Sequence, residues 1–246
     1  MKLLVILPVL KDDANEERNR KELSLLKGAD LSFVVRSLPG GPASIESEFD
    51  DRMASPWVLE EVAKSRSEGF DAIFVSCMGD VAINAARELA GVPVIAPLQT
   101  CLAVASTLGD TTGVVTVLKN LVPIINRRAR EYGFDKNLAG VRSIEVPVLE
   151  IESNRRRVVE GLVSESKDLV EKKHADSVIL GCTGLLGVAK EVQDRVGVPV
   201  LDPVPVSVRF AEMLVATRLS SSRSAFPAPP KKLRRLPGLT APTRKS

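Results

Sequence analysis

The chain has 246 residues, 44% of them hydrophobic and 26% charged, which is typical of a globular protein with a substantial core. Its three cysteines, Cys77, Cys101 and Cys182, are too few and too widely spaced for a disulfide framework. They fit a reduced, cytoplasmic protein. Because the chain has one histidine and no CxxC pair, we expect no metal site.

The formal net charge of +3 comes from the C-terminal segment 220–246, which carries seven basic residues and no acidic one. Without this segment the chain is acidic, and aromatic residues make up only 4% of it. Nucleic-acid-binding proteins usually carry basic charge on the folded body, so we expect no nucleic-acid partner. The composition of this tail, rich in Pro and Ser, predicts disorder.

The first ten residues form an apolar run that superficially resembles a signal peptide. The run is short, contains Pro8 and passes directly into charged residues without a cleavage site. We therefore interpret it as a buried strand. No stretch of the sequence reaches the length of a membrane span, and we expect no membrane partner.

Apolar runs alternate with amphipathic stretches along the whole chain, a pattern that predicts parallel strands connected by helices. In chain order we expect strand 2–9, helix 14–27, strand 31–36, helix 55–68, strand 71–77, helix 80–90, strand 92–95, helix 98–108, strand 112–117, helix 119–132, strand 141–147, helix 153–173, strand 176–181, helix 184–196, strand 198–201 and helix 205–219. The strands are rich in Val, Ile and Leu, as in parallel sheets covered on both faces. The sequence therefore predicts an α/β fold.

An internal repeat is the most informative feature of the sequence. Residues 71–77 read Asp-Ala-Ile-Phe-Val-Ser-Cys, and residues 91–97 read Gly-Val-Pro-Val-Ile-Ala-Pro. Residues 176–182 read Asp-Ser-Val-Ile-Leu-Gly-Cys, and residues 197–203 read Gly-Val-Pro-Val-Leu-Asp-Pro. The repeat predicts two similar, pseudo-symmetric sub-domains with a cleft between them.

We assign residues 1–98 to the first sub-domain and 99–204 to the second. Helix 205–219 is expected to pack back on the first sub-domain, and 220–246 forms the tail.

Each copy of the repeat ends a buried strand on a cysteine, Cys77 or Cys182. Ligands of parallel sheets bind beyond the carboxyl ends of the strands, so both thiols are expected to face one cleft. A following helix N-terminus would lower their pKa values. Two opposed thiols suit racemisation, in which one removes a proton from a carbon and the other returns one to the opposite face. Cys101 has no partner in the repeat and is expected in the core.

Five motifs resemble those of the aspartate/glutamate racemase superfamily, and within it the hydantoin/allantoin racemase branch. Residues 180–184, Leu-Gly-Cys-Thr-Gly, look like the second cysteine motif of that branch. Residues 77–81, Cys-Met-Gly-Asp-Val, and 85–89, Ala-Ala-Arg-Glu-Leu, look like its first. Residues 41–47 resemble a segment that lines the substrate pocket, and 114–118 the strand that opens the second half.

The resemblance implies a homo-oligomeric racemase of a small molecule, a 5-substituted hydantoin or related cyclic ureide, that uses no cofactor. It implies Cys77 and Cys182 as the acid/base pair. Residues 221–231 resemble the closing segment of the branch, which implies that the tail is ordered to about residue 238. The expected substrate-binding residues are Pro8, Ser44, Ile45, Met78, Gly79, Thr116, Val117, Thr183 and Gly184.

Two positions depart from the branch: Leu-Pro-Val stands at 7–9 in place of Asn-Pro-Asn, and Gln99 stands where Glu is frequent. Asp80 adds a carboxylate near Cys77, which would raise the thiol pKa unless the side chain caps the following helix. Phe49 and Trp57 are expected to pack in the core, and His174 at a helix end, without a catalytic role.

Four other functions remain open from the sequence. An amino-acid racemase of the same superfamily would have to grip an α-carboxylate. A decarboxylase of this fold needs only one cysteine, and a cysteine hydrolase needs a well-placed base, usually histidine. A two-lobed binding protein would bind the ligand without exchanging its protons.

Overall fold

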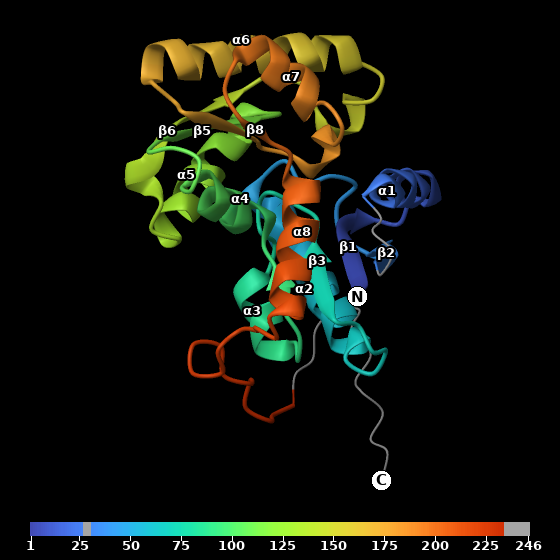
Figure 1. The fold of residues 1–246 in the computed structure, drawn as a ribbon. Coiled ribbons are helices and arrows are strands. Elements are labelled where there is room, and N and C mark those ends of the chain that lie inside the picture. The colour runs from blue at the N-terminus through green and yellow to red at the C-terminus, as the bar shows by residue number, and fades with distance from the viewer. Residues whose placement is uncertain (27–30, 234–246) are drawn as a thin grey trace.

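The computed structural model describes residues 1–26 and 31–233 of the chain. Over these residues the chain folds into two four-stranded parallel sheets with helices on their faces (Figure 1), which confirms the predicted α/β class. Residues 220–233 of the tail are described, and 234–238, where we also expected order, lie outside the described residues.

The first sheet has the strand order β2-β1-β3-β4. Its strands are β1 (Lys2–Leu10), β2 (Ser32–Leu38), β3 (Ala72–Val75) and β4 (Val94–Ile95). Successive side chains of a strand point to opposite faces of a sheet. Leu4 and Ile6 accordingly pack with helices α2 (Glu48–Ser65) and α3 (Ile83–Leu89). Leu3 and Val5 pack on the other face with α1 (Asp13–Leu25) and α8 (Pro203–Ala216).

The second sheet repeats this arrangement in the order β6-β5-β7-β8. Its strands are β5 (Thr112–Thr116), β6 (Leu138–Ser143), β7 (Ser177–Leu180) and β8 (Val200–Leu201). The helices packed on it are α4 (Pro97–Ala105), α5 (Val122–Glu131), α6 (Arg155–Lys173) and α7 (Ala189–Val196). Short 3-10 helices are η1 (Lys119–Leu121), η2 (Asp135–Asn137), η3 (Val148–Glu150) and η4 (Thr183–Leu185).

Two helices connect the halves of the molecule. Helix α8 leaves the second sheet and runs along the first, where it contacts β3 and β4 (Figure 1). Helix α4 contacts both α8 and β7, and it therefore lies between the two sheets. The division of the chain at residues 98 and 99 stays a prediction.

The largest difference from the predicted elements is the start of α2, which we expected at residue 55. The helix begins at Glu48, because the Ser47 side chain caps it by accepting a hydrogen bond from the Asp50 N–H. Phe49, which we expected in the core, lies in this additional first turn and is 72% exposed. Trp57 packs against the first core as expected, and Cys101 is fully buried.

Candidate active site

A cleft that is partly open to solvent lies beyond the carboxyl ends of the strands, between the two sheets. Leu7, Pro8 and Val9 line it from the end of β1. Cys77 reaches it from the loop after β3, and Cys182 from the loop after β7. Both thiols are partly exposed. The repeat thus brings equivalent cysteines of the two halves to one cleft.

The two thiols are held in the same way. The backbone N–H of Gly79 donates to the Cys77 sulfur over 3.4 Å, and the N–H of Gly184 donates to the Cys182 sulfur over 3.4 Å. A Cβ atom added at Gly79 would lie 3.6 Å from the Cys77 sulfur, and one at Gly184 would lie 3.5 Å from the Cys182 sulfur. These two glycines let the backbone fold closely over each thiol.

The thiols do not sit at the N-termini of α-helices, and the predicted lowering of their pKa values is wrong. Helix α3 begins only at Ile83, and α7 only at Ala189. Cys182 caps only the short 3-10 helix η4, and each sulfur accepts from a single backbone N–H instead of meeting the dipole of an α-helix. Burial raises the pKa of Cys182 to about 11 and raises that of Cys77 further.

Charge near Cys77 adds to the effect of burial. A negative charge on Cys182 raises the pKa of Cys77, as do the carboxylates of Asp51 and Asp80. The hydrogen bond from the Gly79 N–H has the opposite effect and lowers the pKa of Cys77. Because ionisation of one thiol disfavours ionisation of the other, the pair is expected to carry at most one negative charge near neutral pH.

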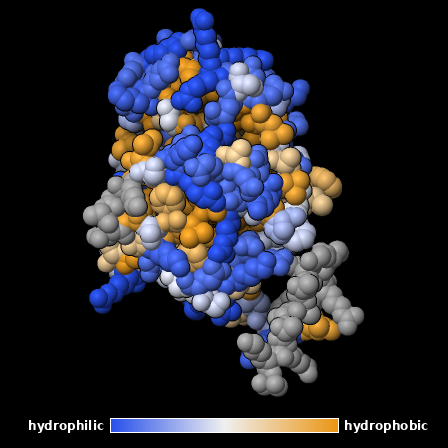
Figure 2. All heavy atoms as spheres, turned by 90° about the vertical axis from the view of Figure 1, so that its right-hand side faces the viewer, coloured by the Kyte–Doolittle hydropathy of each residue, from blue (hydrophilic) through white to orange (hydrophobic). Residues whose placement is uncertain are grey.

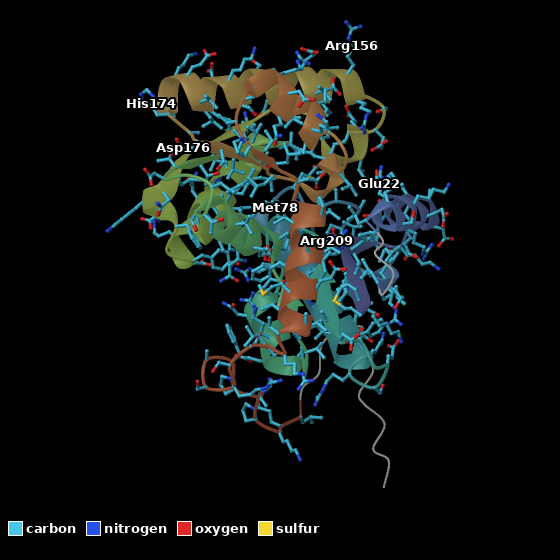
Figure 3. All side chains as sticks on the ribbon, viewed as in Figure 1. Glu22, Met78, Arg156, His174, Asp176 and Arg209 are labelled. Carbon is cyan, nitrogen blue, oxygen red and sulfur yellow. The ribbon has the colours of Figure 1, made fainter. Side chains whose placement is uncertain are left out.

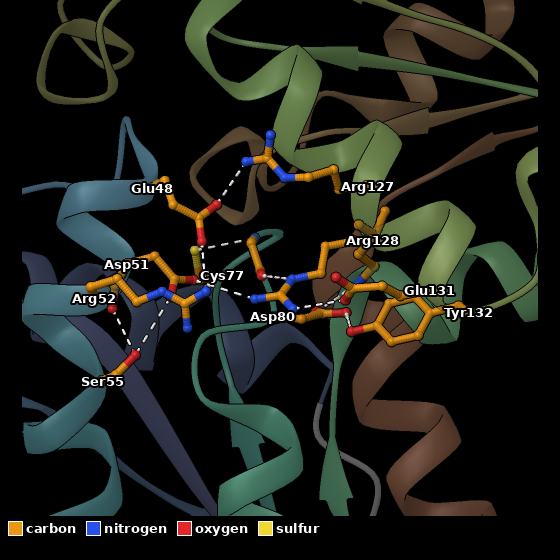
Figure 4. A network of polar contacts seen from close by, with 12 residues as sticks. Glu48, Asp51, Arg52, Ser55, Cys77, Asp80, Arg127, Arg128, Glu131 and Tyr132 are labelled. Carbon is orange, nitrogen blue, oxygen red and sulfur yellow. Dashed lines mark hydrogen bonds and ion pairs between the residues drawn. The ribbon is translucent and has the colours of Figure 1, made fainter.

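Asp80 caps a helix, but a different helix from the one we expected. Its carboxylate accepts from the N–H groups of Leu98, at 3.0 Å, and Gln99, at 3.1 Å, in the first turn of α4. The Tyr132 hydroxyl donates to it over 2.8 Å (Figure 4). Burial raises the pKa of Asp80 to about 6. This carboxylate ties the Cys77 loop to α4 and to the end of α5.

Arg128 of α5 joins the same network from the second half. Its Nε donates to the carbonyl of Gly79 over 3.2 Å, and its guanidinium lies 3.9 Å from the Asp51 carboxylate (Figure 4). Asp51 is 2% exposed, and its Oδ2 atom has no hydrogen-bond partner among the described residues. Burial accordingly raises the pKa of Asp51. The network fixes the loop that follows Cys77.

The structure places some of the predicted binding residues in the cleft and others behind it. The predicted residues that line the cleft are Pro8, Ile45, Cys77, Cys182, Thr183 and Gly184. Met78 and Val117 belong to the core of the second half, with Met78 near the junction of the halves (Figure 3). Thr116 is fully buried, and its hydroxyl donates to the carbonyl of Gly181. Gly79 lies behind Cys77, and Ser44 is half-buried outside the cleft lining.

The sequence interpretation missed a polar wall of the cleft, which α1 supplies. The α1 residues that line the cleft are Asn15, Arg18, Asn19 and Glu22. Their spacing of three, four and seven residues places them on one face of a helix. The predicted helix 14–27 already contains this periodicity. The periodicity identifies a polar face of the helix, but it does not tell whether that face contacts solvent or a ligand.

Neither a membrane-spanning helix nor a metal-binding cluster is found in the described part of the chain. No helix there is long and apolar enough to cross a membrane. Nor do residues 1–26 and 31–233 contain a group of three or more His, Cys, Asp or Glu side chains that could hold a metal ion.

Comparison with known proteins agrees with this architecture. The family model described as Asp/Glu/Hydantoin racemase matches residues 20–211. A hydantoin racemase from Pseudomonas sp. (strain NS671) is 36% identical over 187 residues, 76% of this chain and 75% of the relative. A hydantoin racemase from Rhizobium meliloti is 34% identical over 199 residues, 81% of this chain and 83% of the relative. The crystal structure of an allantoin racemase from Pseudomonas fluorescens has a TM-score of 0.90 and 28% identity, and covers 96% of this chain and 100% of that one.

Proposed function

Because the chain belongs to the Asp/Glu/hydantoin racemase family and is a racemase, we propose that it inverts C5 of a 5-substituted hydantoin or a related cyclic ureide. The supporting observation is that Cys77 and Cys182, at equivalent positions of two similar halves, line one cleft. The hydantoin racemases among its relatives indicate the substrate class.

In the proposed reaction, one cysteine thiolate removes the proton from C5, and the electron pair left on carbon delocalises into the neighbouring carbonyl group. The other cysteine, as a thiol, gives its proton to the opposite face of the same carbon. The substrate loses one proton and gains one. The two sulfurs have then exchanged roles, and the enzyme is ready for the reverse direction.

The electrostatics of the cleft support one base and one acid at a time. Cys182 has the lower pKa of the pair, so it ionises first. Its charge then disfavours loss of the proton from Cys77. We propose that the active form, whose share increases as the pH rises toward the pKa of Cys182, carries the thiolate on Cys182 and the thiol on Cys77. This form removes a proton with Cys182 and returns one with Cys77.

The proposal is tested by deuterium wash-in at C5 of both enantiomers of a hydantoin in heavy water. The wild type is expected to exchange C5 and invert it from either enantiomer. Cys77→Ser and Cys182→Ser are each expected to abolish inversion, because one of the two opposed groups is missing. Cys101→Ala is the control, since this cysteine is buried in the core away from the cleft. Inversion that persists in either serine variant contradicts the two-thiol mechanism.

We further propose that the protein works in the cytoplasm as a homo-oligomer. A thiolate mechanism needs reduced cysteines, which a reducing compartment maintains. The side chains of Phe49, Met53 and Leu149 are large, hydrophobic and exposed, as expected of residues that a second copy covers. Light scattering after size-exclusion chromatography tests this, and a monomer at micromolar concentration would contradict it.

A further inference from the structure

The two thiol loops are built alike, but different side chains lie behind them. Gly79 and Gly184 hold equivalent places in the two halves, each two residues after the cysteine. A Cβ atom added at Gly184 would lie 3.3 Å from the Ile151 Cδ1 atom, and one added at Gly79 would lie 3.6 Å from the Asp51 Oδ2 atom. The loop of the second half is therefore backed by a methyl group, and the loop of the first half by a carboxylate.

The Asp51 carboxylate lies close to the Cys77 sulfur. Its Oδ2 atom and that sulfur each lie 3.6 Å from the place of an added Gly79 Cβ atom, so the distance between them is at most twice that. Asp51 is 2% exposed, and its Oδ2 atom has no hydrogen-bond partner among the described residues. Water screens a buried charge only weakly, so this carboxylate acts strongly on the groups beside it.

Charges of both signs face Asp51 (Figure 4). Burial raises the pKa of its carboxyl group, and the charge of Glu48 in the same turn of α2 raises it further. Arg128 of α5, 3.9 Å away, and Arg52 lower it, as does the Ser55 hydroxyl, 3.5 Å from the other carboxylate oxygen. The alkaline range in which thiols ionise lies far above the ordinary pKa of a carboxyl group, so Asp51 is negatively charged there.

The charges that act most on Cys77 are all negative. Burial raises its pKa most, and the charges of Cys182, Asp51 and Asp80 raise it further. The two carboxylates differ, because three hydrogen bonds from α4 and from the end of α5 hold that of Asp80. Asp51 lacks such donors at its Oδ2 atom, and its charge is therefore the less compensated of the two.

The charges near Cys182 have opposite signs. Burial raises the pKa of this thiol most, Glu46 raises it further, and Arg18 lowers it. Arg18 belongs to α1, on the face of the molecule that Figure 2 shows, where hydrophilic side chains meet the solvent and their charges are screened. Ile151, which lies behind this loop as Asp51 lies behind the other, is uncharged. The structurally equivalent thiols are therefore electrostatically different.

We propose, resting on the two-thiol function proposed above, that Asp51 is a positioning residue that keeps the proton of the pair on Cys77 and leaves the thiolate on Cys182. It acts through Cys77, because it lies behind that thiol and outside the lining of the cleft. Repulsion between two negative charges disfavours the thiolate of Cys77 and has no counterpart at Cys182. A duplicated pair of cysteines thereby acquires one preferred base.

The test measures the rate at which iodoacetamide alkylates each thiol from about pH 8 to about pH 10. Cys77 is followed in Cys182→Ser and Cys182 in Cys77→Ser, so that each thiol titrates alone. Well below the pKa, the rate of alkylation is proportional to the fraction of thiolate. Adding Asp51→Asn is expected to accelerate alkylation of Cys77 about three- to tenfold at each pH, the effect of removing a nearby like charge, and to leave Cys182 unchanged.

Further variants of Asp51 separate charge from access. Asp51→Ser also removes the charge but is smaller than Asp51→Asn, so equal acceleration in both identifies charge as the cause. It also serves if the asparagine variant does not fold. Asp51→Glu keeps the charge and is expected to keep alkylation of Cys77 slow. Circular dichroism melts verify that each variant is folded.

Glu60→Gln is the matched control. Glu60 is another carboxylate of α2 with a buried oxygen that lacks a hydrogen-bond partner among the described residues. It lies about 13 Å further along the helix than Asp51. The control removes the same charge from the same helix, and it is expected to leave the alkylation rates of both thiols unchanged.

The outcomes separate this inference from the proposed function, because alkylation needs no substrate. If Asp51→Asn leaves the alkylation rate of Cys77 unchanged, the role of Asp51 is wrong and the racemase function stands. If it accelerates both thiols equally, the variant has opened the cleft, and the inference is equally overturned. If the wild type exchanges no proton at C5 of any hydantoin, the proposed function is wrong, whatever the alkylation rates are.

Discussion

The hydroxyl of Thr183 donates a hydrogen bond to the backbone carbonyl of Ser76, 3.1 Å away in the other half of the molecule. Thr183 directly follows Cys182, and Ser76 directly precedes Cys77. This bond therefore connects the two loops that carry the thiols. A reaction that needs two groups on opposite sides of one carbon depends on such a fixed separation.

Thr183→Val removes this hydroxyl and keeps the shape of the side chain. We expect kcat/KM for racemisation to fall about tenfold or more in both directions, because small misplacements of reacting groups are costly. The free energy of unfolding should fall by about 1 kcal/mol. Thr183→Ser retains the hydroxyl and should stay close to the wild type. Equal activity of the valine and serine variants would show that the bond does not position the thiols.

The raised thiol pKa values predict that racemisation is faster at alkaline pH. A cysteine with a raised pKa keeps its proton to higher pH, so the fraction present as thiolate increases about tenfold for each pH unit below that pKa. With the pKa of Cys182 at about 11, kcat/KM should increase from about pH 7 to about pH 10. Alkylation of Cys182 by iodoacetamide, followed by mass spectrometry, should show the same increase. A plateau near neutral pH would contradict the assignment.

The same pKa shift predicts a loss of stability with increasing pH. The unfolded chain releases the Cys182 proton near the ordinary value of about 8.5, whereas the folded chain holds it until about 11. Over this interval the folded state binds more protons, so stability is fully present below the lower value and is lost as the pH rises. Urea unfolding at several pH values should show a steeper loss for the wild type than for Cys182→Ser, whose hydroxyl does not titrate there.

Gly181, immediately before Cys182, has no room for a side chain. A Cβ atom there would lie 2.9 Å from the Thr116 Cα and 3.0 Å from the Val115 carbonyl oxygen, both backbone atoms of the neighbouring strand. Gly181→Ala should therefore move β7 away from β5 and destabilise the protein by about 1–3 kcal/mol. Gly91→Ala is the matched control, because an added Cβ meets nothing within 4 Å. Thermal melts compare the two, and similar melting temperatures would contradict the steric argument.

The repeat was sufficient to predict the fold because both of its copies end buried strands at equivalent positions. Runs such as 71–77 and 176–181 read as strands covered on both faces, and these runs form β3 and β7. What the sequence could not provide was local geometry. The turns between Cys77 and α3 use a left-handed backbone at Asp80 and Ala82, residues that do not signal it in the sequence. The predicted start of the helix after Cys77 was wrong for this reason, and the pKa of Cys77 is raised by burial instead of being lowered by a helix dipole.

The candidate site was predicted in part for a similar reason. Cysteines at strand ends identify a cleft, because the carboxyl ends of parallel strands meet there. The polar face of α1 shows only that some residues avoid the core, and its periodicity is the same whether the face meets water or a ligand. Only the packing of α1 beside the cleft distinguishes these cases, and that packing depends on contacts between distant parts of the chain.

Arg223 of the tail predicts a structural role for the segment after α8. Its guanidinium donates to the carbonyl of Arg87, at 3.3 Å, to that of Glu88, at 3.1 Å, and to that of Ala90, at the C-terminal end of α3. Phe226 lies under the Arg87 guanidinium, with 5.5 Å from its ring centre to the guanidinium carbon. Carbonyl groups at a helix end lack partners within the helix, so this arginine caps α3 and anchors the tail.

Arg223→Ala should release this anchor and destabilise α3, with a loss of about 1–2 kcal/mol in the free energy of unfolding. Chymotrypsin should then cleave after the exposed Leu219 several-fold faster, and amide hydrogens of 220–233 should exchange faster, because cleavage and exchange both require local opening. Arg156→Ala is the control, since Arg156 projects from α6 at the opposite end of the molecule (Figure 3). Rates of cleavage and exchange in Arg223→Ala equal to those of the wild type would show that other contacts, mainly those of Phe226, hold the tail.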